Sequence, residues 1–140
     1  MATSDENLKT DYTKVVALAL YSPAQEQFLI FRRNQNQSGA GKWEFPGGKV
    51  EANESFVEAL IREIKEELDL DLDENQIVYI GENKHDYGFK KIHILLYQYN
   101  LDQPVFKLAD HDQSAWIDQT SYKKFDISDA DQPFLVGLFK

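Results

Sequence analysis

The sequence predicts an α/β or α+β fold in which a mixed β-sheet lies between helices. Segments rich in strand-forming residues occur along most of the 140-residue chain, whereas two segments space their apolar residues as helices do. Hydrophobic residues make up 42% of the chain and aromatic residues 13%, which is enough to fill a core. A chain of this length fits one domain, and we expect it to cover residues 14–140.

The predicted strands are runs of β-branched and aromatic residues separated by turn-forming residues. Residues 14–22 and Gln27–Arg33 are separated by the short stretch "PAQE", which predicts a hairpin. The other predicted strands are a brief extended piece in "WEFPGG" that Pro46 closes, two strands at 76–87 and 90–101 joined around Gly88, and a shorter strand at 114–118.

A helix is predicted from residue 55 onward. Ser55 or Asn53 can cap its first turn, and Glu58 stands three residues after Ser55, as a capping box requires. A terminal helix is predicted within residues 129–140, with Pro133 near its start. The apolar stripe of the first helix consists of Val57, Leu60, Ile61, Ile64 and Leu68.

The N-terminal residues 1–13 are polar and lack the basic start and apolar middle of a signal peptide, so we expect them to be flexible. The longest apolar run, residues 15–21, is too short to span a bilayer, which predicts that the chain has no membrane partner. The absence of cysteine excludes disulfides, thiolate metal sites and thiol catalysis. A cytoplasmic location is therefore expected.

The net charge of −9 argues against a stable nucleic-acid partner, and we expect a monomer or a homodimer. The acidity is local: residues 51–74 contain ten acidic and two basic residues, whereas the remaining 14 acidic and 13 basic residues nearly cancel. A local field of this kind either faces water or holds cations.

Three carboxylates crowd one helical segment. Glu63, Glu66 and Glu67 are expected to face away from the core, and one interpretation is an acidic surface exposed to water. However, Glu63 and Glu67 form a repulsive i, i+4 pair, and Arg62 and Lys65 are too few to neutralise the cluster. Hard cations such as Mg²⁺ take oxygen ligands of this type and are completed by substrate phosphates. A site for a divalent cation therefore explains the clustering.

The same residues carry a family resemblance. Gly48 is followed after five residues by Glu54, and after seven more residues by "REIKEELDL". This pattern resembles the Nudix box, GX5EX7REUXEEXGU, where U is a bulky apolar residue. It departs from the box at Asp69, where the family usually has glycine, so the left-handed turn that ends the helix is in question. Aspartate tolerates that conformation better than most residues do.

The resemblance implies an α/β/α sandwich and a hydrolase that uses Mg²⁺ or Mn²⁺ to cleave a nucleoside diphosphate linked to a further group. By motif position, the metal ligands would be Glu63, Glu66, Glu67 and the Gly48 carbonyl. Glu54 would stand beside them, and Arg62 would orient a glutamate by ion pairing. Relatives also use a carboxylate before a late tryptophan, for which this chain offers Asp110 and Asp112.

Metals in such a site neutralise the polyphosphate and activate the attacking water, and a carboxylate takes the water's proton. Glu66 and Glu67 are both candidates for that proton acceptor.

"KWEFPGGKVE" resembles the MutT-like subgroup, which cleaves nucleoside triphosphates to monophosphate and pyrophosphate and includes enzymes that remove oxidised guanine nucleotides such as 8-oxo-dGTP. Arg33 is a candidate phosphate ligand and Asp131 a candidate base-reading residue. Their alternatives are an exposed arginine at a strand end and an ordinary helix cap. The three histidines His85, His93 and His111 lack metal-ligand spacing and are assigned no role.

Two alternative functions stay open. One is a Nudix hydrolase of RNA 5′ triphosphate ends, dinucleoside polyphosphates or nucleotide sugars, for which the only obvious basic cluster is Lys84, Lys90 and Lys91. The other is a noncatalytic nucleotide-binding module.

Overall fold

The computed structural model describes residues 11–139. Its strands are β1 (Thr13–Ser22), β2 (Gln27–Arg33), β3 (Trp43–Glu44), β4 (Gly47–Lys49), β5 (Val78–Asp86), β6 (Lys91–Asn100) and β7 (His111–Ile117). Its helices are α2 (Phe56–Leu68), α3 (Gln132–Leu138) and two short 3₁₀ turns at Glu74–Gln76 and Tyr122–Lys124. No helix in this range is long and apolar enough to cross a membrane.

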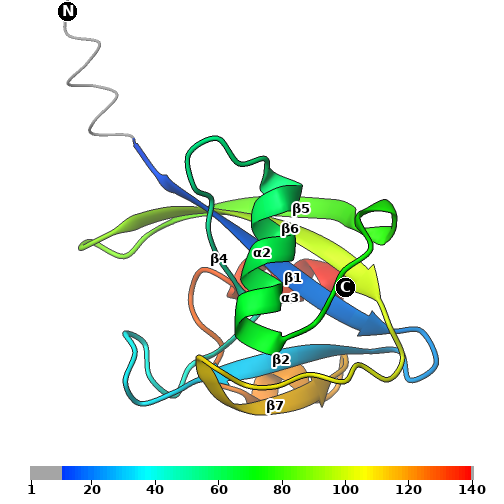
Figure 1. The fold of residues 1–140 in the computed structure, drawn as a ribbon. Helices are drawn as coiled ribbons and strands as arrows, with labels where there is room; N and C mark the ends of the chain where they lie inside the picture. Colours follow the sequence, from blue (N-terminus) through cyan, green and yellow to red (C-terminus); the bar gives the residue numbers. More distant parts are fainter. Residues whose placement is uncertain (1–10, 140) are drawn as a thin grey trace, which may run out of the picture.

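The β-sheet is mixed, as predicted. β1 lies in its centre, parallel to β6 and antiparallel to β2 and β4. β5 extends the sheet beyond β6, and β3 and β7 both pair with β2 (Figure 1). The predicted hairpin between residues 14–22 and Gln27–Arg33 is confirmed by the antiparallel pairing of β1 with β2.

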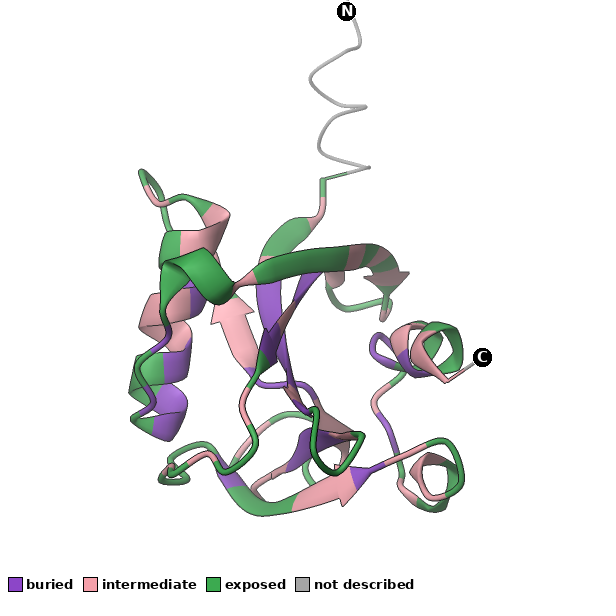
Figure 2. Ribbon diagram, turned by 90° about the vertical axis from the view of Figure 1, so that its right-hand side faces the viewer, coloured by how far each residue is buried: buried purple, intermediate pink, exposed green. Residues whose placement is uncertain are grey.

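Helices lie on both faces of the sheet (Figure 2), and an apolar layer fills the space on each face. Leu60, Ile64 and Leu68 of α2 pack on the face that carries Leu18 and Leu95. On the opposite face, Leu135 of α3 packs with Ala17, Ile30, Leu96 and Ile117. The fold is therefore the predicted α/β/α sandwich with a mixed sheet between helices.

The start of α2 confirms Ser55 as its cap. The Ser55 hydroxyl accepts a hydrogen bond from the Glu58 backbone N–H at 3.0 Å, and the Glu58 carboxylate accepts one from the Ser55 N–H at 2.8 Å. Both halves of the capping box are thus present, which satisfies two backbone donors that the helix itself leaves free.

The end of α2 answers the question raised by Asp69. This residue adopts the left-handed conformation, with φ 54° and ψ 38°, and its backbone N–H donates to the Lys65 carbonyl at 3.0 Å. The departure from the motif therefore leaves the turn in place. Its side chain forms an ion pair with Lys65 at 3.1 Å.

The predicted strand boundaries differ from the structure by up to three residues. β7 begins at His111 rather than at residue 114, because its pairing with β2 continues to the partner pair Arg33 and His111. β1 begins at Thr13, one residue before the predicted start of the domain. The predicted flexibility of the N-terminus falls for residues 1–10 outside the described residues.

Replacing Asp69 with glycine is expected to raise the free energy of unfolding by up to about 1 kcal/mol, because glycine adopts positive φ without steric cost. The exposed ion pair with Lys65 that is lost contributes less than that. Urea unfolding of Asp69→Gly measures the change. Asp71→Gly is the matched control, since Asp71 also contacts Lys65 at 3.1 Å but lacks a positive φ. An Asp69→Gly variant no more stable than the control would contradict the prediction.

Candidate active site

The centre of the candidate site is the contact between β4 and α2. Gly48 of β4 pairs with Val16 of β1, which places its Cα directly against the carboxylate of Glu63. A Cβ atom at Gly48 would lie 2.3 Å from the Glu63 carboxylate carbon, so only glycine leaves the carboxylate where it is. A Cβ at Gly47 would lie 1.8 Å from the Val16 carbonyl oxygen. Gly47 therefore makes room for the backbone of β1, and Gly48 makes room for the Glu63 carboxylate.

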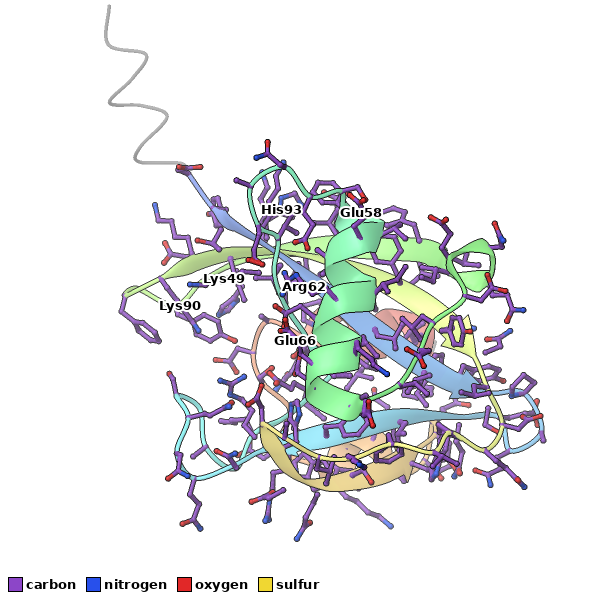
Figure 3. All side chains as sticks on the ribbon, in the orientation of Figure 1. Lys49, Glu58, Arg62, Glu66, Lys90 and His93 are labelled. Carbon is purple, nitrogen blue, oxygen red and sulfur yellow. The ribbon has the colours of Figure 1, made fainter. Side chains whose placement is uncertain are left out.

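Arg62 connects α2 to the segment that follows β4 (Figure 3). Its guanidinium donates to both oxygens of Glu54, at 2.6 and 3.0 Å, and to the Lys49 carbonyl at 3.0 Å. It also lies 2.9 Å from Glu63 and 3.4 Å from Glu66. The hydrogen bond from Arg62 lowers the pKa of Glu54 to about 2. One cation thus holds three carboxylates of the motif.

Glu67 is buried, with 5% of its surface exposed, and the prediction that all three glutamates face away from the core is wrong for this residue. The cause is the segment between β6 and β7, which folds over the end of α2. Lys107 N–H donates to the Leu68 carbonyl at 2.8 Å, and Ala109 N–H donates to the Glu67 carbonyl at 3.2 Å. Burial, together with the nearby charges of Glu63, Glu44 and Asp110, raises the pKa of Glu67 to about 9.

The side chains around Glu67 fit a divalent cation. Within residues 11–139, no three acidic or histidine side chains are already gathered as metal ligands. Glu63 and Glu66 instead form ion pairs with Arg62. However, Glu67 Oε2 is buried and has no hydrogen-bond partner among the described residues. A carboxylate that is desolvated, crowded by like charges and left with a free oxygen is stabilised by an added cation, and hard oxygen ligands suit Mg²⁺ or Mn²⁺.

The two carboxylates proposed outside the motif have different surroundings. Asp110 lies close enough to Glu67 for its charge to contribute to the raised pKa. Asp112 instead forms an ion pair with Arg32 at 2.7 Å, which lowers the pKa of Asp112. The structure therefore brings Asp110 to the site and leaves Asp112 paired elsewhere.

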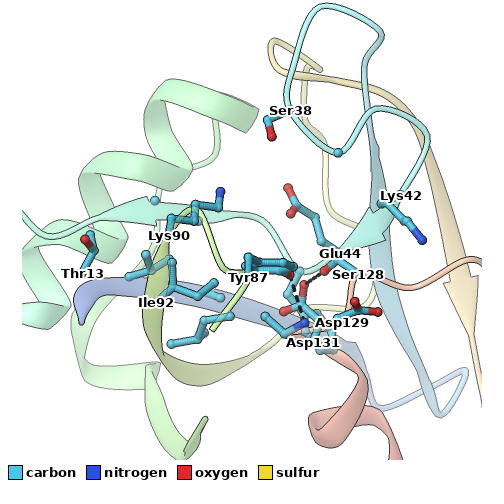
Figure 4. Close-up of a pocket in the computed structure, with 18 of the residues that line it drawn as sticks. Thr13, Ser38, Lys42, Glu44, Tyr87, Lys90, Ile92, Ser128, Asp129 and Asp131 are labelled. Carbon is cyan, nitrogen blue, oxygen red and sulfur yellow. Dashed lines mark hydrogen bonds between the residues drawn. The ribbon is translucent and has the colours of Figure 1, made fainter. Parts of the chain in front are cut away.

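A cavity of about 610 Å³ adjoins the carboxylates (Figure 4). Its walls come from β1, β4, the loop after β2, the turn between β5 and β6, and the segment before α3. Gly48 lines this cavity and also touches Glu63, so the cavity and the carboxylate cluster meet at one residue.

Arg33 and Asp131, the two residues predicted to bind substrate, both line the cavity. Arg33 donates to Glu44 at 3.0 Å and to the Ser38 carbonyl at 2.6 Å, so it is not a free strand-end arginine. Asp131 is 4% exposed and forms no side-chain cap on α3. It is hydrogen-bonded to the hydroxyl of Ser128. Burial, reinforced by the charge of Glu44, raises the pKa of Asp131 to about 8.

The sequence reasoning missed three residues: Glu44, Tyr87 and His111. Glu44 and Tyr87 line the cavity, and Tyr87 accepts a hydrogen bond from the Ala130 N–H at 3.1 Å. His111 lies 2.9 Å from Glu44 and is buried. The available signal for Glu44 was a charged residue between Trp43 and Phe45 in an apolar strand.

Alanine at Gly48 is expected to displace the Glu63 carboxylate and to weaken Mn²⁺ binding about 10- to 100-fold, the usual scale for disturbing the surroundings of a metal site. Stability should change little, because the displaced atoms are the end of a flexible side chain. Mn²⁺ titration followed by electron paramagnetic resonance measures the affinity. Gly81→Ala is the control, since a Cβ there would lie 4.0 Å from its nearest neighbour. Equal affinities in the two variants would refute the steric argument.

The raised pKa of Asp131 predicts a pH dependence of stability. Between pH of about 4 and 8, the unfolded chain releases the Asp131 proton while the folded chain keeps it, so this residue's contribution to stability falls as pH rises and levels off above pH 8. In Asp131→Asn this part of the fall should disappear. Denaturant unfolding at several pH values tests this. The control Asp129→Asn, at an exposed neighbour, should retain the wild-type fall.

The comparisons with known proteins agree with this geometry. The NUDIX domain model matches residues 11–135. A CTP pyrophosphohydrolase of Escherichia coli is 28% identical over 109 residues, covering 78% of this chain and 79% of that protein. An 8-oxo-dGTP diphosphatase of Proteus vulgaris is 32% identical over 55% of this chain and 67% of that protein. The crystal structure of a MutT protein from Methanosarcina mazei has the same fold, with a TM-score of 0.78 at 23% identity over 91% and 92% of the two chains. The chain therefore belongs to the NUDIX domain family.

Proposed function

We propose that this NUDIX-family pyrophosphohydrolase uses Mg²⁺ or Mn²⁺ to cleave nucleoside and deoxynucleoside triphosphates, including oxidised ones such as 8-oxo-dGTP, to the monophosphate and pyrophosphate. The supporting observation is the position of Gly48, which lines the 610 Å³ cavity and contacts Glu63. A nucleoside in the cavity would direct its phosphates toward the carboxylates. The names of the two curated relatives, both of which act on nucleotides, favour this class of substrate.

The proposed metal ligands are the carboxylates of Glu63, Glu66 and Glu67, with the Gly48 carbonyl and Asp110 as further donors. A divalent cation held there would neutralise the phosphates and promote attack by water on phosphorus. Because Arg62 holds Glu54 and Glu63, its role would be to keep the motif's carboxylates in place.

The proton of the attacking water would pass to Glu66 or Glu67, and the surroundings of these two residues differ. The side chain of Glu66 is 59% exposed, so water reaches it directly. Glu67 is enclosed and has a raised pKa, which increases its affinity for a proton.

Base selection is assigned to Asp131 and its neighbours. A carboxyl group that is buried and protonated donates a hydrogen bond to a base carbonyl, whereas the ionised form accepts one from an amino group. Tyr87 and Glu44 lie at the same end of the cavity (Figure 4). The candidate base contacts are therefore grouped at one end of the cavity, where Glu44 also accepts a hydrogen bond from Arg33.

The turn between β5 and β6 supports a second candidate function. Phe89 is 75% exposed and lines the cavity together with Lys90. An exposed aromatic beside a lysine is suited to a second base or to an RNA 5′ end. Dinucleoside polyphosphates, nucleotide sugars and RNA 5′ triphosphate ends are therefore the competing substrates.

A nucleotide panel with Mg²⁺ separates these possibilities. Release of pyrophosphate from nucleoside triphosphates, with oxygen from labelled water in a phosphate-containing product, supports the proposal. Stepwise release of phosphate, or cleavage confined to dinucleotides or RNA ends, selects the second candidate. The absence of turnover with every substrate would indicate a noncatalytic nucleotide-binding module.

Replacing Glu67 with glutamine is expected to abolish hydrolysis, a loss of at least about 100-fold in kcat, because it removes a proposed metal ligand. The folded protein should be unchanged or more stable above neutral pH, since the variant no longer buries an ionisable group. Initial rates at saturating Mg²⁺ and thermal unfolding test both parts. Full activity of Glu67→Gln would refute the assignment.

Asp131→Ala is expected to reduce kcat/KM for the preferred nucleotide. The loss of transition-state stabilisation should be about 1 to 3 kcal/mol, the usual cost of an unpaired buried contact. Poor substrates should change little, because the phosphate contacts are retained. The measurement compares 8-oxo-dGTP, dGTP, dCTP and dATP as ratios of variant to wild type. A uniform fall for all four would mean that Asp131 only supports the fold.

A further inference from the structure

Two buried side-chain polar atoms of the described residues have no hydrogen-bond partner, and their side chains are neighbours. They are Glu67 Oε2 and His111 Nδ1. An unsatisfied buried polar atom loses its hydrogen bonds to water without replacing them, so native proteins keep few of them. The two side chains approach each other to 3.9 Å, between His111 Nδ1 and Glu67 Oε1, so both unsatisfied groups lie at one point of the site.

His111 stands between two carboxylates. Its side chain is 1% exposed, Nε2 lies 2.9 Å from Glu44 Oε2, and Nδ1 lies 3.9 Å from Glu67 Oε1. The ring is also packed at a centroid distance of 5.5 Å from the ring of Phe31. The ring therefore faces Glu44 through Nε2, at hydrogen-bond distance, and Glu67 through Nδ1, at a distance too long for a hydrogen bond.

Glu44, the partner of His111 Nε2, connects this contact to the cavity. Glu44 lines the cavity and accepts a hydrogen bond from Arg33 at 3.0 Å. A continuous series of side chains, Arg33, Glu44, His111 and Glu67, therefore runs from the proposed nucleotide pocket to the proposed metal ligands.

The backbone fixes the ring on both sides. The Asp110 carbonyl accepts a hydrogen bond from the Asn34 N–H at 3.2 Å, and the Ala109 N–H donates to the Glu67 carbonyl at 3.2 Å. Ala109 and Asp110, which precede His111, are thus hydrogen-bonded to α2 and to the loop after β2. These bonds hold the backbone that carries the ring between the two carboxylates.

We propose that His111 is a positioning residue that holds the carboxylates of Glu67 and Glu44 in their working orientations and so links metal binding to nucleotide binding. The proposal rests on the proposed function for the identity of the metal and the nucleotide. The Glu44 contact is a hydrogen bond, whereas the Glu67 contact is a packing contact at 3.9 Å. Side chains that surround the ligating groups orient them, and their loss weakens metal binding about 10- to 100-fold.

Two amide substitutions separate the two halves of the role. The amide nitrogen of asparagine takes the approximate place of Nδ1, and that of the longer glutamine takes the approximate place of Nε2. His111→Gln should therefore lose the contact with Glu67 and bind Mn²⁺ about 10- to 100-fold more weakly. His111→Asn should keep the Mn²⁺ affinity within about threefold and, because Glu44 is released, show a raised KM for the nucleotide.

His93→Gln and His93→Asn are the matched controls. His93 also contacts a glutamate, Glu82, at 2.7 Å, but this pair lies on β5 and β6 outside the cavity lining. Both controls should match the wild type in Mn²⁺ affinity and KM. Mn²⁺ titration by electron paramagnetic resonance, denaturant unfolding and steady-state kinetics supply the three readouts.

Wild-type Mn²⁺ affinity in His111→Gln would overturn the proposal, and so would equal weakening in both His111 variants in proportion to their loss of stability. If neither His111 variant folds, Glu44→Asp replaces them, because it keeps the charge that acts on Glu67 and withdraws the carboxylate from His111. A Mn²⁺ affinity reduced several-fold then supports the link through His111, and an unchanged affinity overturns it. Failure of the proposed function is a separate result. The Mn²⁺ titrations need no substrate, so they test the role of His111 even if the wild-type protein hydrolyses no nucleoside triphosphate.

Discussion

The ion pairs of Arg62 are the interaction on which the site depends. Glu54, Glu63 and Glu66 come within hydrogen-bonding or ion-pairing reach of a single guanidinium, which also donates to the Lys49 carbonyl. Without this cation, like charges at helical spacing would repel, and the segment after β4 would lose its polar connection to α2. The planar fork of arginine suits this role, because it donates in several directions at once, whereas lysine offers one point charge.

Glu67 has the opposite environment, and the contrast explains how the site divides its tasks. Arg62 neutralises the exposed side of the cluster, but Glu67 is buried, its backbone carbonyl is bonded to the segment between β6 and β7, and its Oε2 has no hydrogen bond from the described residues. Burial of a carboxylate without a partner opposes folding. A proposed metal site at this position therefore requires the rest of the fold, mainly the two apolar layers, to supply stability that Glu67 removes.

Features that depend on neighbouring residues in the chain were predictable from the sequence. The apolar stripe of α2 and its capping box follow from spacings of three and four residues, and both are present. The motif also identified Gly48 and Arg62. The burial of Glu67 was not predictable, because it depends on residues 101–110, which form no helix or strand and have no periodic pattern. For the same reason His111 showed no signal: its partners Glu44 and Glu67 lie 67 and 44 positions away in the chain.

The pairing of β4 with β1 joins the cavity to the carboxylates, because Gly48 of β4 lines the cavity and contacts Glu63. Gly47 must lack a side chain because the Val16 carbonyl approaches it, and Gly48 must lack one because the Glu63 carboxylate does. Val16 lines the cavity from the centre of the sheet, and Glu63 belongs to the helix that packs on the sheet. A short strand of three residues therefore sets the distance between the cavity floor and the charged face of α2. β1 is paired on both sides, by β4 and β6, so the backbone between the cavity and α2 is hydrogen-bonded within the sheet. The proposed nucleotide and cation would thus meet across paired strands, while Glu63 and Glu66 reach the cation from the helix through their side chains.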